Sequence, residues 1–134
     1  MLYLDTNFYT ALANGKDEAV SMLKGRHELC LPLPVIAELK YGFIKGSHKQ
    51  NNERILQRFI AQPYVSISIP TVKTTDIYSE LQFHCTKTGK VLSHNDLWIA
   101  ALTKETKGIL VTYDQDFTAL KEVMPEMLFI LGTR

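Results

Sequence analysis

Short apolar runs recur along the chain, separated by longer stretches in which apolar residues repeat with helical spacing. The runs are rich in Val, Ile and Leu and are mostly continuous rather than alternating, which is typical of strands buried on both faces of a parallel sheet. They predict strands at Leu2–Leu4, Glu28–Leu31, Val65–Ile69, Ile109–Thr112 and Leu128–Leu131.

Helical periodicity occupies the intervals between these runs. It predicts helices at Phe8–Ala13, Asp17–Lys24, Val35–Ile44, Asn52–Ala61, Thr74–Thr86, Asn95–Thr106 and Phe117–Val123. The polar stretch Lys45–Asn52 (KGSHKQNN) is expected to be a loop. Strands that alternate with helices in this way predict an α/β sandwich with a central, mainly parallel sheet of about five short strands and right-handed crossovers.

Composition narrows the class of protein without deciding its function. The 134 residues are expected to form one domain spanning 1–134, and the net charge of +1 argues neither for nor against a nucleic acid partner. No basic leader precedes a long apolar run, and no stretch is long enough to span a membrane. Cys30 and Cys85 are isolated thiols, which favours a reducing, cytoplasmic environment.

Acidic residues follow two of the predicted strands directly. In LYLDTN Asp5 comes directly after the strand, and in ILVTYDQDF Asp114 follows the strand with Asp116 two residues later. Each acid has an ordinary structural explanation, because Asp, Thr and Asn are preferred at helix N-termini and in turns.

Two further acids lie on predicted helices. Asp96 has the S-x-x-D spacing of a capping box with Ser93, and it also borders the apolar face of its helix. Glu38 lies at the edge of the apolar stripe of its helix, where solvent exposure is the ordinary alternative.

The predicted topology brings these acids toward one place. Ligands of open α/β sheets bind beyond the carboxyl ends of the strands, where Asp5 and Asp114 are expected. Clustered carboxylates without cationic partners repel one another and raise each other's pKa, and a divalent cation removes that repulsion. Carboxylate and water oxygens suit Mg²⁺ or Mn²⁺, and such a site can activate water for attack on a phosphodiester.

Four segments carry a resemblance to a known family. LYLDTN, VIAELKYGF, LSHNDLWIAA and LVTYDQDF together resemble the PIN-domain ribonucleases, specifically the VapC-type toxins of toxin–antitoxin pairs, and the resemblance covers essentially the whole chain. It implies a PIN-like three-layer α/β/α sandwich. It also implies an acidic quartet around Mg²⁺, with Mn²⁺ as an alternative, supported by two polar neighbours; the residues are Asp5, Glu38, Asp96, Asp114, Thr6 and Asn7.

The same resemblance implies an activity and partners. The chain would be a Mg²⁺-dependent endoribonuclease toxin that hydrolyses RNA with metal-activated water, forms a homodimer, and is blocked by a cognate antitoxin that lays an apolar segment into a groove. Apolar side chains on the early helices are candidate groove walls, unless they belong to the core: Phe8, Tyr9, Leu12 and Met22.

Some assignments stay open at this level. Asp116 competes with Asp114 as the fourth acid, and the preferred hypothesis gives Asp114 the metal and Asp116 the helix N-cap. A local excess of basic residues could bind RNA or could be a solvated helix face: Lys40, Lys45, Lys49, Arg54 and Arg58. Rival functions are a catalytically silent PIN domain that binds RNA or protein and, less favoured, an aspartate-nucleophile phosphatase.

Overall fold

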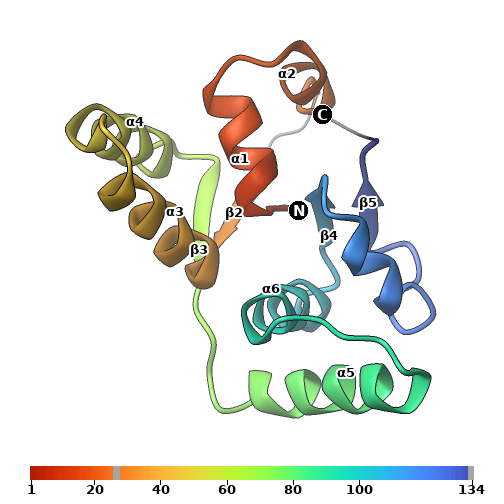
Figure 1. Cartoon of the computed structure of the whole chain (residues 1–134). Helices are drawn as coiled ribbons and strands as arrows, with labels where there is room; N and C mark the ends of the chain where they lie inside the picture. Colours follow the sequence, from red (N-terminus) through yellow and green to blue (C-terminus); the bar gives the residue numbers. More distant parts are fainter. Residues whose placement is uncertain (26–27, 133–134) are drawn as a thin grey trace.

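The five strands form a single parallel sheet in the order β3-β2-β1-β4-β5. The computed structural model describes residues 1–25 and 28–132 (Figure 1). The strands are β1 (Leu2–Leu4), β2 (Leu29–Pro32), β3 (Val65–Ser68), β4 (Ile109–Thr112) and β5 (Leu128–Ile130). All five predicted strands are therefore confirmed, with ends that differ by at most one residue.

Helices lie on both sides of this sheet. In Figure 1, α1 and α2 lie above the strands, α5 and α6 lie below them, and α3 and α4 flank the β2–β3 side. The helices are α1 (Thr6–Ala13), α2 (Asp17–Met22), α3 (Leu33–Lys45), α4 (Lys49–Ile60), α5 (Thr74–Thr88), α6 (His94–Glu105) and the 3-10 helix η1 (Gln115–Leu120). The predicted three-layer α/β/α sandwich is confirmed.

Strand order reverses between β1 and β4. The chain runs outward from β1 through β2 to β3, then returns to place β4 on the other side of β1. Leu2 pairs with Ile109 and Leu4 with Val111, so the two strands end at the same edge of the sheet. A reversal of this kind leaves a crevice at the carboxyl ends of the strands, which is where open α/β sheets bind ligands.

Two predicted boundaries were wrong for local reasons. The polar stretch after α3 is mostly helical, because α4 begins at Lys49 and exposes its polar side chains while burying Leu56. The predicted α-helix Phe117–Val123 is instead a 3-10 helix that begins at Gln115. Asp114, rather than Asp116, caps it, since the Asp114 side chain accepts a hydrogen bond from the Asp116 backbone N–H.

The core extends along β1 and onto both helical layers. Tyr3, Phe8, Leu31, Leu97 and Phe117 are among its largest fully buried side chains. No described helix is long and apolar enough to cross a membrane. The two free cysteines noted in the sequence are both buried.

Tyr3 is held in place from two directions. Its hydroxyl forms a hydrogen bond with the Thr106 hydroxyl, and its ring lies against the backbone of Gly108 at the start of β4. A methyl group added at Gly108 would lie 2.5 Å from Cε1 and 2.6 Å from Cδ1 of the Tyr3 ring. Only glycine therefore fits at this position without displacing a buried aromatic side chain.

We expect Gly108→Ala to lower the free energy of unfolding by about 1–3 kcal/mol, because overpacking a well-filled core has a cost of that order. Gly42→Ala is the matched control. It lies in the interior of α3 with nothing within 4 Å of the added carbon, so it should raise stability by about 0.5–1 kcal/mol. Urea denaturation of both variants measures the difference, and equal effects of the same sign would contradict this packing.

Candidate active site

The Asp5 carboxylate is buried at the junction of β1 and α1. The residue is 3% exposed and occupies the N-cap position of α1. Its Oδ1 accepts a hydrogen bond from the Thr6 backbone N–H at 2.9 Å, and its Oδ2 accepts one from the Thr112 hydroxyl at 2.6 Å. The capping role expected from the sequence is therefore confirmed, but it occupies only one carboxylate oxygen.

Thr112 links this carboxylate to the end of β4. While donating to Asp5, its hydroxyl oxygen also accepts a hydrogen bond from the Asp114 backbone N–H at 2.9 Å. Asn7 adds a second link, because its side-chain oxygen accepts from the Tyr113 backbone N–H at 3.0 Å. These bonds fix Asp5 and Asp114 at neighbouring strand ends.

Glu38 is held by donors from two other elements. Its Oε1 accepts a hydrogen bond from the Thr6 hydroxyl at 2.9 Å and another from the Asn95 side-chain amide at 2.7 Å. Thr6 belongs to α1 and Asn95 to α6, so one carboxylate oxygen on α3 joins three helices. Glu38 is exposed, as the ordinary alternative expected, and these two hydrogen bonds orient its side chain.

Asp96 lies in the first turn of α6. Ser93 is the N-cap of that helix, and its hydroxyl accepts a hydrogen bond from the Asp96 backbone N–H at 3.1 Å. This hydrogen bond pairs one of the free backbone N–H groups at the N-terminus of α6, and it is the capping interaction that the sequence predicted. The Asp96 side chain is half-buried on the side of the other acids.

Electrostatics shows that the four predicted acids form one group. The pKa of the Asp5 carboxyl is raised to about 6, mainly by burial; the charges of Glu38 and Asp114 also raise it, and the hydrogen bonds from Thr112 and Thr6 lower it. Burial also raises the pKa of Asp96 to about 6, with Asp5, Asp114 and Glu38 as repelling neighbours. Asp116 is exposed and is not among the charges that act on these two carboxyls.

The donor set suits a hard divalent cation. Every charged group in the cluster is a carboxylate, and oxygen ligands are those that Mg²⁺ and Mn²⁺ prefer. Among the residues that the structure describes, no three His, Cys, Asp or Glu side chains already converge on one metal position. Mg²⁺ does not require three, because it usually keeps several waters and binds through one or two carboxylates. Burial and the neighbouring carboxylates together raise two pKa values in this group, and a bound divalent ion would favour the charged carboxylates.

The basic residues lie on α3 and α4, and none of them takes part in the hydrogen bonds described above. All of them are exposed, namely Lys40, Lys45, Lys49, Arg54 and Arg58. Lys40 forms an ion pair with Glu53 at 2.8 Å. Lys45 lies 4.6 Å from the centre of the Tyr41 ring, and Arg54 donates to the Asn51 side chain.

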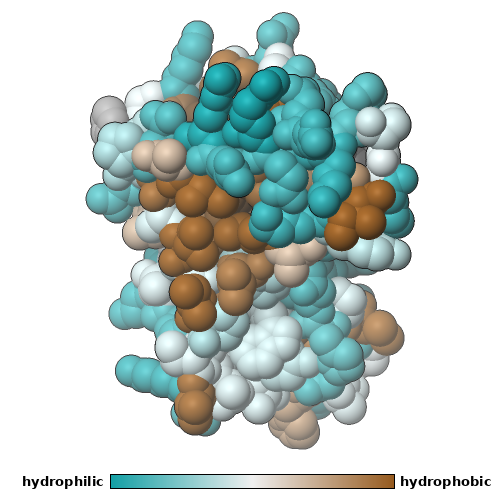
Figure 2. Space-filling view, turned by 90° about the vertical axis from the view of Figure 1, so that its left-hand side faces the viewer, coloured by the Kyte–Doolittle hydropathy of each residue, from teal (hydrophilic) through white to brown (hydrophobic). Residues whose placement is uncertain are grey.

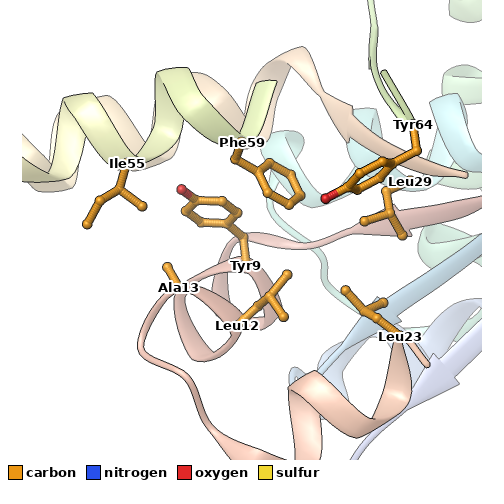
Figure 3. A pocket seen from close by; sticks show the side chains of 8 residues that line it. All are labelled: Tyr9, Leu12, Ala13, Leu23, Leu29, Ile55, Phe59 and Tyr64. Carbon is orange, nitrogen blue, oxygen red and sulfur yellow. The ribbon is translucent and has the colours of Figure 1, made fainter. Parts of the chain in front are cut away.

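An apolar groove separates α1 from α4 (Figure 3). It has a volume of about 400 Å³ and is lined by Tyr9, Leu12, Ala13, Leu23, Leu29, Ile55, Phe59 and Tyr64. Tyr9 and Phe59 meet edge to face with ring centres 5.3 Å apart. Tyr9 and Leu12 were predicted as groove walls, whereas Phe8 is fully buried in the core against Tyr113 and Met22 does not line the groove.

Sequence reasoning missed two residues of the site. Thr112 carries the hydroxyl that joins Asp5 to Asp114, and Asn95 carries the amide that holds Glu38. A polar residue at the end of the apolar run ILVT was a signal for the first. The position of Asn95 directly before Asp96 was a signal for the second.

We expect unfolding of the metal-free protein to become easier as the pH rises from about 4 to about 6. Because the folded-state pKa of Asp5 lies above its unfolded value, the folded state binds more protons in that window and loses this stabilisation as they dissociate. Asp5→Asn should therefore raise the free energy of unfolding at pH 7.5 by about 1–2 kcal/mol. Urea denaturation in EDTA across this pH range and at pH 7.5 measures the free energy of unfolding, with the exposed Glu80→Gln as control. Lower stability of Asp5→Asn at pH 7.5 would refute the electrostatic cost assigned to Asp5.

Comparison with known proteins gives relatives along nearly the whole chain. Ribonuclease VapC2 of Rickettsia felis is 29% identical over 117 residues, which cover 84% of this chain and 86% of the relative. Ribonuclease VapC5 of Mycobacterium tuberculosis is 26% identical over 121 residues, covering 87% and 85%. These names confirm the resemblance to VapC-type ribonucleases that the four sequence segments indicated.

Solved structures share the fold. The crystal structure of VapBC2 from Rickettsia felis, bound to a DNA fragment from their promoter, matches with a TM-score of 0.81 and 26% identity, covering 98% of this chain and 100% of that one. DNA-bound VapBC from Salmonella typhimurium matches with a TM-score of 0.80 at 17% identity and 96% coverage of both chains, which supports the fold alone. The sequence profile of the PIN domain matches residues 2–123, and the chain therefore belongs to the PIN domain family.

Proposed function

We propose that this protein is a Mg²⁺-dependent endoribonuclease and the toxin of a toxin–antitoxin pair. The observation that carries the proposal is the group of four carboxylates at the ends of β1 and β4, two of which have pKa values raised to about 6 by burial and mutual repulsion. A structural role alone gives no reason to concentrate uncompensated acids at the strand-order reversal of the sheet. Strongly shifted pKa values in such a place are typical of functional sites.

Asp5 and Asp96 are the residues proposed to hold the metal most directly, with Glu38 and Asp114 around them. A bound Mg²⁺ would lower the pKa of a water molecule and stabilise charge on the phosphate under attack. Thr112 and the Thr6 backbone orient Asp5, while the Thr6 hydroxyl and Asn95 orient Glu38. These positioning contacts keep the acids at one edge of the sheet despite their repulsion.

The rival functions fit the geometry less well. An aspartate-nucleophile phosphatase usually carries a second Asp two positions after the nucleophile, where this chain has Asn7, whose side-chain oxygen accepts a hydrogen bond from the Tyr113 backbone N–H. A silent domain that only binds RNA would gain nothing from carboxylates that repel the phosphate backbone. The metal-dependent nuclease accounts for both observations.

The relatives supply the substrate class and the biological setting. Both matched proteins bear the name ribonuclease, and the similar crystal structures include complexes of toxin with antitoxin. By this relationship we assign RNA as the substrate, a cognate antitoxin as the partner and the cytoplasm as the place of action. The exposed cations on α3 and α4 remain candidates for contacts with RNA.

The groove between α1 and α4 is the proposed antitoxin surface. Its walls are aromatic and aliphatic, so an apolar segment of the partner would bury against Tyr9, Leu12 and Ile55 (Figure 3). Exposed cations on the neighbouring α4, among them Arg54 and Arg58, would favour acidic residues beside that segment.

A homodimer remains part of the proposal. Figure 2 faces the side of α3, α4 and β3 and shows hydrophobic side chains gathered near the middle of this face. The exposed aliphatic residues on or next to these elements include Leu33, Ile44, Ile67 and Ile69. An apolar surface of this kind is a candidate for contact with a second copy of the chain.

We expect Asp5→Asn and Asp96→Asn each to lower the rate of cleavage of single-stranded RNA by at least about 100-fold in Mg²⁺, because each removes a charge that the ion needs. The folded proteins should also lose the rise in melting temperature that Mg²⁺ gives the wild type, since an ion that binds only the folded state stabilises it. Expression of the wild type alone should arrest growth, and neither variant should.

Glu80→Gln, a charge removed from the exposed face of α5, is the control and should keep both activity and the response to Mg²⁺. Near wild-type cleavage by Asp5→Asn or Asp96→Asn would rule out the proposed metal site.

Substitutions of Asp114 and Asp116 are expected to differ sharply in their effect on Mg²⁺-dependent cleavage. Asp114→Asn should weaken Mg²⁺-dependent cleavage by at least about 10-fold, because its charge acts on both Asp5 and Asp96. An Asn keeps the cap of η1, so stability should change by less than about 0.5 kcal/mol. Asp116→Asn should change the cleavage rate by less than about twofold. Its side chain is exposed, and Asp116 takes part in the cap only through its backbone N–H, which donates to the Asp114 side chain. Cleavage rates against Mg²⁺ concentration for both variants decide the matter, and a larger loss for Asp116→Asn would reverse the assignment.

A further inference from the structure

A second cavity lies between the carboxyl end of α5 and η1, on residues that the carboxylate site does not use. It has a volume of about 460 Å³, which is within the range of cavities that hold small organic ligands. Its polar lining consists of His84, Thr88 and Lys90 on one side and Thr118, Lys121 and Glu122 on the other.

His84 is the most informative residue of this cavity. It is 9% exposed, and within residues 1–25 and 28–132 its ring has neither a hydrogen bond nor an ion pair. No buried side-chain nitrogen or oxygen of the described residues lacks a hydrogen-bond partner, so the unpaired ring nitrogens of His84 are open to the solvent of the cavity and can bind a ligand there. The imidazole offers one donor and one acceptor, or a flat surface for stacking.

The rest of the lining supplies complementary groups. Lys90 and Lys121 are exposed and form no ion pair within the described part of the chain, and only Glu122 opposes them. The hydroxyls of Thr88 and Thr118 already donate to the backbone oxygens of His84 and Gln115. Their lone pairs remain free to accept hydrogen bonds, so the cavity combines cations for a phosphate with acceptors for a hydroxyl or amino group.

The cavity is also placed along a path from the carboxylates. η1 begins directly after Asp114, and Thr118 lies roughly 8 Å further along the helix axis at about 2 Å of rise per residue.

We propose that this cavity binds one nucleotide of the RNA strand outside the cleaved bond, with a phosphate on Lys90 and Lys121 and the nucleoside against His84, Thr88 and Thr118. The choice of RNA rests on the proposed ribonuclease function. The site would hold the strand on η1 while the phosphate under attack lies at the carboxylates.

Binding of a fluorescent single-stranded RNA in EDTA tests the proposal, because no cleavage occurs without metal. The double variant Lys90→Gln/Lys121→Gln should weaken binding about fivefold at 0.1 M salt for each phosphate that is no longer neutralised by a lysine. It should also flatten the dependence of log affinity on log salt by about 0.7 for each such phosphate. Lys24→Gln/Lys73→Gln removes the same charge from exposed positions elsewhere and should have a smaller effect on both quantities. Equal losses of affinity for the two double variants would overturn the proposal.

Nuclear magnetic resonance of the His84 ring identifies what enters the cavity. Titration of the full chain with 5′-mononucleotides should shift the His84 signals, and titration with inorganic phosphate at the same concentrations should shift them much less. No shift with nucleotides, or an equal shift with phosphate alone, would overturn the assignment of a nucleotide site. Neither readout depends on catalysis, so a failure of RNA cleavage and a failure of this site are separate results.

Discussion

The burial of the Asp5 carboxylate is the constraint on which the rest of the structure depends. A charge removed from water has a high free-energy cost unless it is paired, and here hydrogen bonds from Thr6 and Thr112 offset only part of that cost. The neighbouring acids add repulsion instead of relieving it, so the pKa of Asp5 rises to about 6, mainly through burial and to a smaller extent through the charges of Glu38 and Asp114. The fold maintains this arrangement because the β1–β4 pairing and the core hold the carboxylate where it is.

One short helix connects the two surfaces proposed to matter for function. The first turn of α1 contributes Asp5 as its cap and Thr6 as a donor to Glu38, while Tyr9 and Leu12 further along line the apolar groove. A segment bound in the groove would therefore lie on the helix that orients the acids. This continuity gives a physical basis for a partner that controls the activity without occupying the carboxylate cluster.

Most elements could be predicted because their signals are local. The strand β1 is a buried apolar run, Ser93 caps α6, and the periodicity of α5 defines that helix. The errors arose where two local signals competed. Both Asp114 and Asp116 suit an N-cap, and the choice of Asp114 follows from where β4 ends and η1 begins. Phe8 was a candidate for either the groove or the core; it lies in the core, whereas Tyr9, the next residue around α1, lines the groove.

The sequence by itself determined the succession of strands and helices along the chain and the family, because these follow from periodicity, capping preferences and motifs that are read locally, and it singled out the four acids as candidates. Tertiary structure alone decided which side chains meet. Thr112 lies 107 residues from Asp5 and Asn95 lies 57 residues from Glu38, so no local pattern could pair them. The raised pKa values also depend on the tertiary structure, because desolvation and repulsion act through space and arise only when the sheet places β1 beside β4.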